Sequence, residues 1–334
     1  MAERVLVIVS IDTEEDNWHR SRHEVTCENI RELEYQARVF ERLGARPTYF
    51  TTYQVAMDPA AAGVLREVGR QGEIAAHLHP WNTPPLTEAF VPRNSMLKNL
   101  PAALQFSKLR TLTLALTRAF DARPRAFRAG RYGLGSDSVG ALRKCGYEVD
   151  SSVMPFVSWE DVDDGPSFIG APLDAYRLAP DRAVTQPAAG GKIVEVPLSC
   201  GFNRGPFPIW GRVRRALDVP ALRPLRLAGI AARSGLCKRI VLSPELANAS
   251  EMLTLSRRLL ERGVRHLHLT WHSPSLVPGL GPFTKTQADV RSLYATVERY
   301  LDRLSRLASP TFVTVSEAAA ALAPALPRPE VFAC

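Results

Sequence analysis

The feature that most limits the possible folds of this chain is an alternation of two kinds of segment. Apolar, β-branched runs of strand length recur, and stretches with helical spacing lie between several of them. Such alternation is typical of a parallel sheet with crossover helices, and seven or eight strands favour a closed barrel. The predicted strands are 4–12, 46–52, 72–79, 125–130, 147–154, 192–199, 265–273 and 311–315, and the predicted helices are 28–43, 97–120, 245–262 and 285–307.

The length of 334 residues fits one α/β barrel with elaborations. We predict a single domain over 1–323, with loop insertions at about 155–189 and 200–235. The first insertion is rich in Pro, Gly and Asp and resembles a cover over the barrel mouth. The segment 324–334 has three prolines and is expected to be a disordered tail.

Cysteine usage and hydropathy bear on the compartment. The five cysteines are scattered and show no C-x-x-C spacing, which favours reduced thiols over a disulfide framework or a thiolate zinc site. The apolar start of the chain runs into acidic residues without a small-residue cleavage site, so a signal peptide is not expected. No apolar run approaches the ~18 residues of a membrane-spanning helix. The sequence therefore predicts a cytoplasmic protein.

The basic charge is concentrated in one segment. Between residues 204 and 239 there are nine basic residues and one acid, a difference of +8 that equals the formal net charge of the whole chain. Trp210 and several leucines lie among the arginines, a pattern that suits the surface of an anionic membrane. A solvated cover over the barrel is the alternative, because Pro220 and Pro224 interrupt any long helix. No nucleic-acid-binding signature accompanies the charge.

Chemically active residues cluster where the predicted strands end. The first strand runs into four carboxylates within five positions, Asp12 to Asp16, which must be reached by water or by a cation. Asp12 and Glu14 are two residues apart and so lie on one face of an extended chain. His77 and His79 repeat that spacing at the end of the third strand, and His272 ends the seventh.

Each of these features has an ordinary explanation, such as an acidic turn or a packed histidine. Together, at the carboxyl ends of barrel strands, two imidazoles and a carboxylate favour a metal site with positions left for water and substrate. Trp81, Trp159 and Trp271 could stack on sugar rings, with core packing as an equal alternative.

Five motifs, in order, resemble the polysaccharide deacetylase superfamily, carbohydrate esterase family 4, with its NodB-homology fold. The resemblance covers roughly 5–320. The motifs are Ser10-Ile11-Asp12-Thr13-Glu14, Glu73-Ile74-Ala75-Ala76-His77-Leu78-His79, Phe127-Arg128-Ala129-Gly130-Arg131-Tyr132-Gly133, Asp150-Ser151-Ser152 and Leu269-Thr270-Trp271-His272-Ser273. The resemblance implies a distorted (β/α)7–8 barrel, one divalent metal ion that is most often zinc, and removal of an acetyl group from an N-acetylated amino sugar.

The resemblance also implies roles for individual residues. Asp12 is the expected general base on the attacking water, His272 the general acid, and Arg128 the residue that holds Asp12. Glu14, His77 and His79 are the expected metal ligands. Trp81 and Tyr132 are the expected substrate-binding residues.

Three departures from the family pattern bear on these roles. The common first motif has adjacent aspartates, whereas here Thr13 separates Asp12 from Glu14, so either acid could be the ligand. The common second motif is H-x-x-x-H, but Trp81 stands where its second histidine would be, so His79 must complete the site. The third motif usually reads Arg-x-Pro-Tyr, and here Gly130 and Arg131 precede the tyrosine.

We therefore predict a metal-dependent deacetylase of a polysaccharide, an oligosaccharide or a lipid- or nucleotide-linked glycan precursor. Two alternatives stay open. The first is hydrolysis of another amide, a formyl sugar or a small ureide, as in a deformylase or an allantoinase. The second is a non-catalytic sugar-binding protein with a degenerate metal site.

Overall fold

A curled, mostly parallel β-sheet is the centre of the computed structural model, which describes residues 4–18, 25–219 and 224–323. The predicted tail, 324–334, and Pro220 lie outside these ranges. The strand order is β10-β1-β2-β3-β4-β5-β7-β6, and β11 also pairs with β1. The strands are β1 (Arg4–Thr13), β2 (Thr48–Thr51), β3 (Glu73–Leu78), β4 (Ala126–Ala129), β5 (Val149–Asp150), β6 (Tyr176–Leu178), β7 (Ile193–Glu195), β10 (His266–His272) and β11 (Ser309–Val313).

All the predicted strands are present and the distorted α/β barrel is confirmed, but the expectation of a closed barrel is wrong, because the described strands form an open sheet. Its distortion is a gap in the ladder between β7 and β10. Two single hydrogen bonds bridge part of that gap, from Leu242 N–H to the Ser199 carbonyl (2.9 Å) and from Thr270 N–H to the Leu242 carbonyl (3.0 Å). A separate two-stranded antiparallel sheet, β8 (Cys200–Phe202) with β9 (Arg239–Val241), flanks it.

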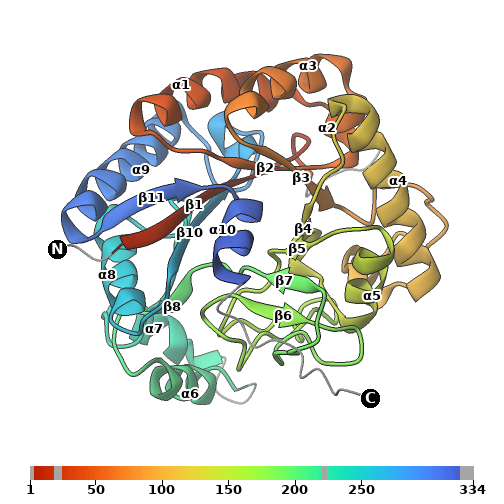
Figure 1. Ribbon diagram of the computed structural model, residues 1–334. Coiled ribbons are helices and arrows are strands. Elements are labelled where there is room, and N and C mark those ends of the chain that lie inside the picture. The colour runs from red at the N-terminus through yellow and green to blue at the C-terminus, as the bar shows by residue number, and fades with distance from the viewer. Residues whose placement is uncertain (1–3, 19–24, 220–223, 324–334) are drawn as a thin grey trace, which may run out of the picture.

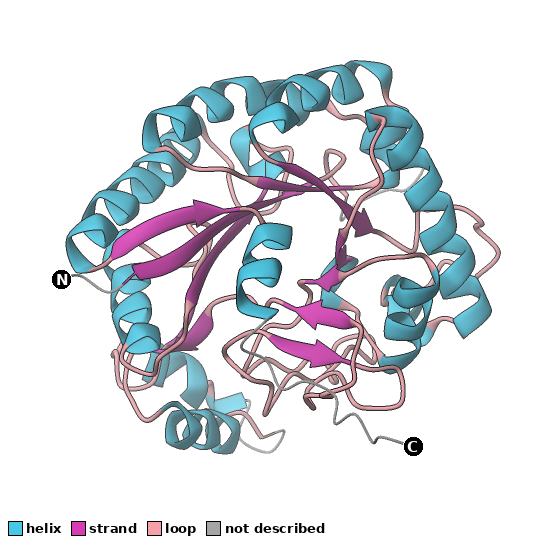
Figure 2. Cartoon of the chain, viewed as in Figure 1, coloured by secondary structure: helices cyan, strands magenta, loops and turns pink. Residues whose placement is uncertain are grey.

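Helices cover the outside of the sheet (Figures 1 and 2). They are α1 (Leu33–Leu43), α2 (Tyr53–Met57), α3 (Pro59–Val68), α4 (Ala102–Phe120), α5 (Ser136–Lys144), α8 (Ala249–Leu260) and α9 (Gln287–Leu307). The predicted helices at 28–43 and 97–120 are shorter than expected, because each begins with a short 3-10 segment, Glu28–Glu32 and Leu97–Asn99. Outside the second insertion, the prediction omitted α2, α3, α5 and α10 (Val315–Leu322).

The two predicted insertions differ in content. Residues 155–189 contain β6 and otherwise turns and irregular backbone. The second insertion carries β8 and two helices, α6 (Phe207–Leu217) and α7 (Leu227–Arg233), which lie side by side at the lower edge of Figure 1.

The two faces of β1 explain where the site lies. Val5, Val7, Val9 and Ile11 point outward into the main core beneath the helices, whereas Ile8 points inward. The inward cluster contains Phe50, Ala75, Val149 and Val194 and is covered by helix α10 (Val315–Leu322).

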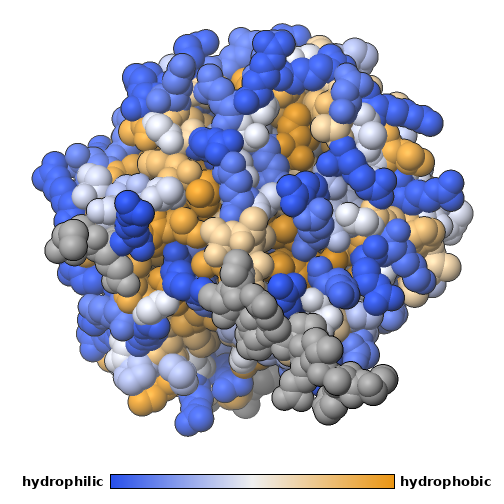
Figure 3. All heavy atoms as spheres, viewed as in Figure 1, coloured by the Kyte–Doolittle hydropathy of each residue, from blue (hydrophilic) through white to orange (hydrophobic). Residues whose placement is uncertain are grey.

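Helix α10 therefore closes the end of the barrel where the strands begin, in the centre of Figure 1. Figure 3 shows pale apolar atoms at this place from the same side, with more strongly hydrophobic atoms beside them and hydrophilic side chains farther out. The inward series of β1 continues through Ser10 to Asp12, at the opposite end.

Candidate metal centre and active site

The four carboxylates at the end of β1 and just beyond it are all buried, and each has its own partners. Asp12, Glu14, Glu15 and Asp16 are between 0% and 3% exposed. Buried carboxylates are tolerated only when hydrogen bonds or positive charge compensate them. Three of the four are compensated within the described structure, and the fourth, Glu14, is compensated only in part.

Asp12 lies against the guanidinium of Arg128, which donates a hydrogen bond from Nη1 to Asp12 Oδ1. Burial alone would raise the pKa of Asp12, but Arg128, His77 and His272 hold it below its ordinary value. Asp12 is therefore ionised near neutral pH. An ionised carboxylate can accept a proton, as a general base must.

Arg128 is fully buried and is held from several directions. Its Nε donates to the Ser151 carbonyl (2.9 Å), Nη1 donates to Thr270 Oγ1 (3.0 Å), and Nη2 donates to Ser10 Oγ (3.0 Å). Its guanidinium carbon lies 4.1 Å from the centre of the Phe50 ring. These contacts fix the cation under Asp12 and account for its burial inside the barrel.

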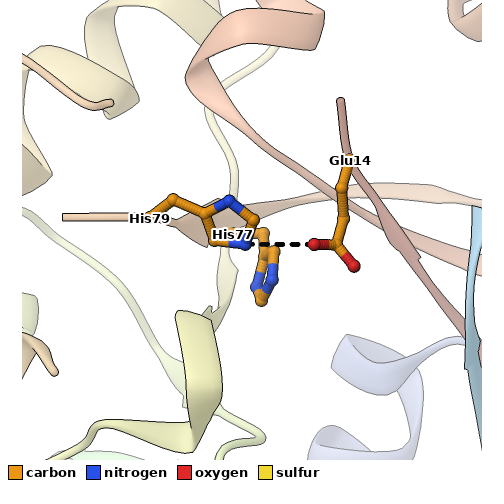
Figure 4. A group of neighbouring side chains, drawn as sticks. All are labelled: Glu14, His77 and His79. Carbon is orange, nitrogen blue, oxygen red and sulfur yellow. Dashed lines mark ion pairs between the residues drawn. The ribbon is translucent and has the colours of Figure 1, made fainter. Parts of the chain in front are cut away.

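Glu14 faces two histidines, His77 in β3 and His79 directly after it (Figure 4). Its Oε2 lies 3.2 Å from His79 Nε2, while its Oε1 is buried and has no hydrogen-bond partner among the residues that the structure describes. Burial raises the pKa of Glu14 above its ordinary value. One possible ligand atom each from Glu14, His77 and His79 lie within 4.8 Å of one another.

The two imidazoles are oriented by their outer nitrogens. Nδ1 of His77 lies 3.1 Å from the Arg128 carbonyl, which can only accept, so this nitrogen carries the proton. Nδ1 of His79 lies 2.9 Å from Glu15 Oε1. Each Nε2 is therefore the nitrogen left to act as a ligand, an arrangement usual for metal-binding histidines.

The two imidazoles differ in charge state. Burial lowers the pKa of His77 to about 3, which leaves that imidazole neutral, the form that binds metal. Although burial opposes protonation of His79, Glu15 and Glu14 raise its pKa to about 9. The positive charge of protonated His79 compensates part of the negative charge of Glu14 and Glu15. A bound cation would compensate the same carboxylates.

The residues present fit a divalent metal ion. Ligands about 2.0–2.2 Å from a tetrahedral ion lie about 3.5 Å from one another, so these atoms, which lie within 4.8 Å of one another, must draw together by up to about 1.3 Å. The unpartnered oxygen of Glu14 supplies the acceptor that a cation would satisfy. Two imidazoles and a carboxylate are a known donor set for catalytic zinc.

His272 lies near the second carboxylate oxygen of Glu14, Oε1. Its Nε2 is 3.7 Å from Glu14 Oε1 and 3.9 Å from Asp12 Oδ2, and its Nδ1 is 2.8 Å from Glu245 Oε2. Burial opposes protonation, but Glu245 and Glu14 raise the pKa of His272 to about 10. The imidazole is therefore protonated near neutral pH, with Nε2–H directed at the site.

Asp16 has a structural part. It accepts hydrogen bonds from the Thr26 hydroxyl (2.8 Å), the Glu28 N–H (2.7 Å) and the Asn29 side-chain amide (2.6 Å). The same amide of Asn29 donates to the Glu14 carbonyl (2.9 Å). Asp16 thus ties the segment before α1 to the backbone of Glu14.

Aromatic rings surround the histidines. Trp81 stacks on His79 with centroids 4.2 Å apart, and Trp18 lies 5.9 Å from His79 and 6.3 Å from His272. Tyr132 stacks on Trp159 at 6.2 Å.

Trp271, by contrast, is 1% exposed and packs on Phe40 in the main core. It cannot stack on a sugar, so the packing explanation is the correct one for this residue.

The unusual third motif has a steric reason. A Cβ at Gly130 would lie 2.6 Å from His79 Cδ2 and 2.6 Å from the Leu78 carbonyl oxygen, distances that no larger residue could tolerate. After Gly130 the chain turns through two left-handed residues, Arg131 (φ 52°) and Tyr132 (φ 57°). Glycine therefore lets β4 approach the end of β3 where His79 turns into the site.

Two functional residues were missed by the sequence prediction. Glu15 accepts hydrogen bonds from Thr52 (2.9 Å) and Asn82 (2.5 Å) besides holding His79. Glu245 holds His272 and was assigned to a helix, whereas α8 begins at Ala249. The available signal was its place just after the apolar run of β9.

No protein-family profile matches the sequence, and a search of curated proteins finds no match. Solved structures do match. A protein described as a candidate polysaccharide deacetylase from Mycobacterium smegmatis aligns over 100% of this chain and 95% of its own, with a TM-score of 0.55 and 15% identity.

Two further structures align over 95% of this chain. The chitin deacetylase of the fungal pathogen Colletotrichum lindemuthianum matches over 88% of its own chain, with a TM-score of 0.45 and 12% identity. A CE4 family pseudoenzyme from Bacillus anthracis matches over 66% of its chain, with a TM-score of 0.42 and 8% identity. The fold assignment rests on the first match: this chain shares its fold with that candidate polysaccharide deacetylase.

Proposed function

We propose that the protein is a metal-dependent hydrolase that removes an acetyl group from an N-acetylated amino sugar. The observation that carries the proposal is the grouping of Glu14, His77 and His79 as possible ligands, with Asp12 and His272 beside them. The shared fold with a candidate polysaccharide deacetylase supports it. Zinc is the proposed ion, because it suits the donor set.

A divalent ion held by Glu14, His77 and His79 would polarise the acyl carbonyl and favour attack by water near neutral pH. The chain supplies the proton transfers. Asp12, kept ionised by Arg128, accepts a proton from the attacking water. His272, kept protonated by Glu245, donates a proton to the leaving amine.

The first test measures metal and product together. Wild-type protein purified without added zinc should contain one divalent ion per chain. It should release acetate from N-acetylglucosamine oligomers, from a nucleotide-linked N-acetyl sugar or from a lipid-linked one. His77→Ala should lose both the ion and the activity. His266→Ala is the matched control, because His266 is an equally buried imidazole of β10 that contacts Asp174 and the Pro197 carbonyl instead.

Each alternative has its own outcome. Full metal content in His77→Ala would show that the ligand set is misplaced. Release of formate from N-formyl sugars, or hydrolysis of a ureide, without acetate release would favour the other amide hydrolases. Sugar binding with neither metal nor turnover would establish a non-catalytic protein.

The basic segment 204–239 is a proposed contact with an anionic membrane. Ile209, Ile230 and Leu236 are 52%, 57% and 49% exposed, and they lie among exposed arginines on and around α6 and α7. Exposed aliphatic side chains beside cations suit a lipid surface better than they suit water. Within the described residues no helix has both the length and the apolarity to cross a bilayer.

Vesicle binding tests this contact. Each basic residue near an anionic surface contributes about 1 kcal/mol, and salt screens it over roughly 8 Å at physiological ionic strength. We expect co-sedimentation with anionic vesicles at low salt, weaker binding at high salt, and little binding to neutral lipid. Changing Arg212, Arg214 and Arg215 to Gln should remove most of it. If wild type ignores anionic vesicles at low salt, the segment is a solvated cover.

A cytoplasmic location is part of the proposal. Cys27, Cys145, Cys200 and Cys237, the cysteines among the described residues, are free thiols, as reducing conditions would keep them.

A further inference from the structure

A cavity of about 430 Å³ opens beside the candidate metal centre. Trp18 and Trp81 form part of its wall, and the same two rings lie next to His79. A ligand in the cavity would therefore lie close to the candidate metal centre. The remaining lining residues are Glu88, Ala89, Phe90, Val91, Pro92, Asn94, Ser95 and Arg131.

Apolar groups dominate one side of this cavity. Ala89, Phe90, Val91 and Pro92 follow one another in the loop between β3 and α4. Phe90 is 60% exposed and Val91 is 47% exposed, although burial of such side chains is normally favourable. An exposed apolar wall next to two tryptophans indicates a surface that is covered when ligand binds.

The charged groups of the cavity are already neutralised. Glu88 is paired with Lys108 at 2.9 Å, and Lys108 is itself fully buried. Arg131 is paired with Asp163 at 2.7 Å and also contacts Ser95. A phosphate or carboxylate entering the cavity would have to compete with these pairs, so an uncharged ligand fits it better.

We propose that this cavity binds an apolar group carried by the amide substrate. The inference rests on the proposed function and adds the substrate class to it: an N-acylated amino sugar with a hydrophobic substituent. The volume lies within the ~300–1,000 Å³ usual for small-molecule sites. The apolar group could be the aglycone of the sugar or a long N-acyl chain, and both present the same chemistry to the cavity.

Two matched substrate series distinguish these sources. One series is the methyl, butyl and hexyl glycosides of N-acetylglucosamine, and the other is the methyl glycoside with acetyl, butanoyl and hexanoyl amides. Each methylene that becomes buried should raise kcat/KM roughly three- to fourfold. We expect kcat/KM to rise at least about tenfold from the shortest to the longest member of the series whose apolar group occupies the cavity.

Phe90→Ala should remove most of that gain, so that its rates with the longest and the shortest substrates become similar. Tyr35→Ala is the matched control, because Tyr35 is a 46% exposed aromatic residue of α1 outside the cavity. A flat response to chain length in both series, with the short substrates hydrolysed, would overturn the cavity assignment and leave the proposed function intact. A preference for N-acetylglucosamine oligomers over hexyl substrates would make the cavity a glycan subsite and also overturn it.

Direct binding keeps the test independent of turnover. Hexyl glucoside, which has no amide, should bind wild-type protein with at least about tenfold higher affinity than methyl glucoside does, as measured by the change in tryptophan fluorescence. Phe90→Ala should lose this difference. If no amide is hydrolysed but this binding difference is present, the proposed function fails while the apolar cavity stands. If the difference is absent from wild type and neither substrate series shows a gain, the cavity assignment is wrong.

Discussion

Replacing Asp12 with asparagine is expected to lower kcat by roughly two to four orders of magnitude, the range for loss of a general base, without loss of metal. The reason is that Asp12 is bonded to Arg128 and is not part of the group formed by Glu14, His77 and His79. It does belong to a second group of possible ligands, with Glu14 and His272, so the metal content of this variant decides between the two groups. Asparagine has the same shape but cannot take the proton from water. Acetate release and elemental analysis of one preparation measure both effects.

The matched variant Glu14→Gln should show the opposite pattern. Loss of a ligand should weaken metal affinity by more than the ~10–100-fold typical of changes outside the ligand set, and added metal should restore part of the activity. Because Asp12→Asn leaves the buried Arg128 without its partner, it should also cost about 3–5 kcal/mol of stability, so both variants are assayed below their unfolding temperatures. The reverse pattern would exchange the roles of the two acids, and full activity in both would contradict the mechanism.

Replacing His272 with alanine should lower kcat by about two to four orders of magnitude while the metal is retained. Its Nε2 faces Asp12 and Glu14 across the site, where a leaving amine would need a proton. An N-acyl substrate with an activated leaving group needs less protonation and should recover much of the loss. Parallel assays with good and poor leaving groups measure this recovery.

Glu245→Gln is the companion to this variant. It keeps the imidazole but removes the carboxylate that raises the pKa of His272. It should therefore cause a smaller loss than His272→Ala, with the same dependence on leaving group. Equal damage with good and poor leaving groups would mean that His272 has a structural role.

The strands could be predicted because each carries its own local signal. The eight predicted apolar runs all contain a strand of the curled sheet, since burial on both faces requires near-continuous hydrophobicity. The omitted helices are short, and two of them, α3 and α10, begin at N-terminal capping residues. Asp58 accepts hydrogen bonds from Ala60 and Ala61 at the start of α3, and Thr314 and Glu317 form a capping box at the start of α10.

The sequence predicted only those parts of the candidate site that depend on the spacing of residues along one strand. Period-two spacing correctly identified residues that lie together: Asp12 with Glu14, and His77 with His79. The contacts that orient the imidazoles join residues far apart in sequence, 64 positions for Glu15 and His79 and 27 for Glu245 and His272. No local pattern encodes such pairs, because they depend on which strands become neighbours.

Helix α10 determines the route by which molecules could reach the site. It closes one end of the barrel against Ile8, Phe50 and Ala75, and Arg128 fills the interior above them with no exposed surface. A glycan therefore cannot pass through the barrel and must lie across its open end. Substrate would enter, and both products would leave, through that one opening. Chain ends and side groups can reach into such an opening more easily than the middle of a stiff, crowded polymer can.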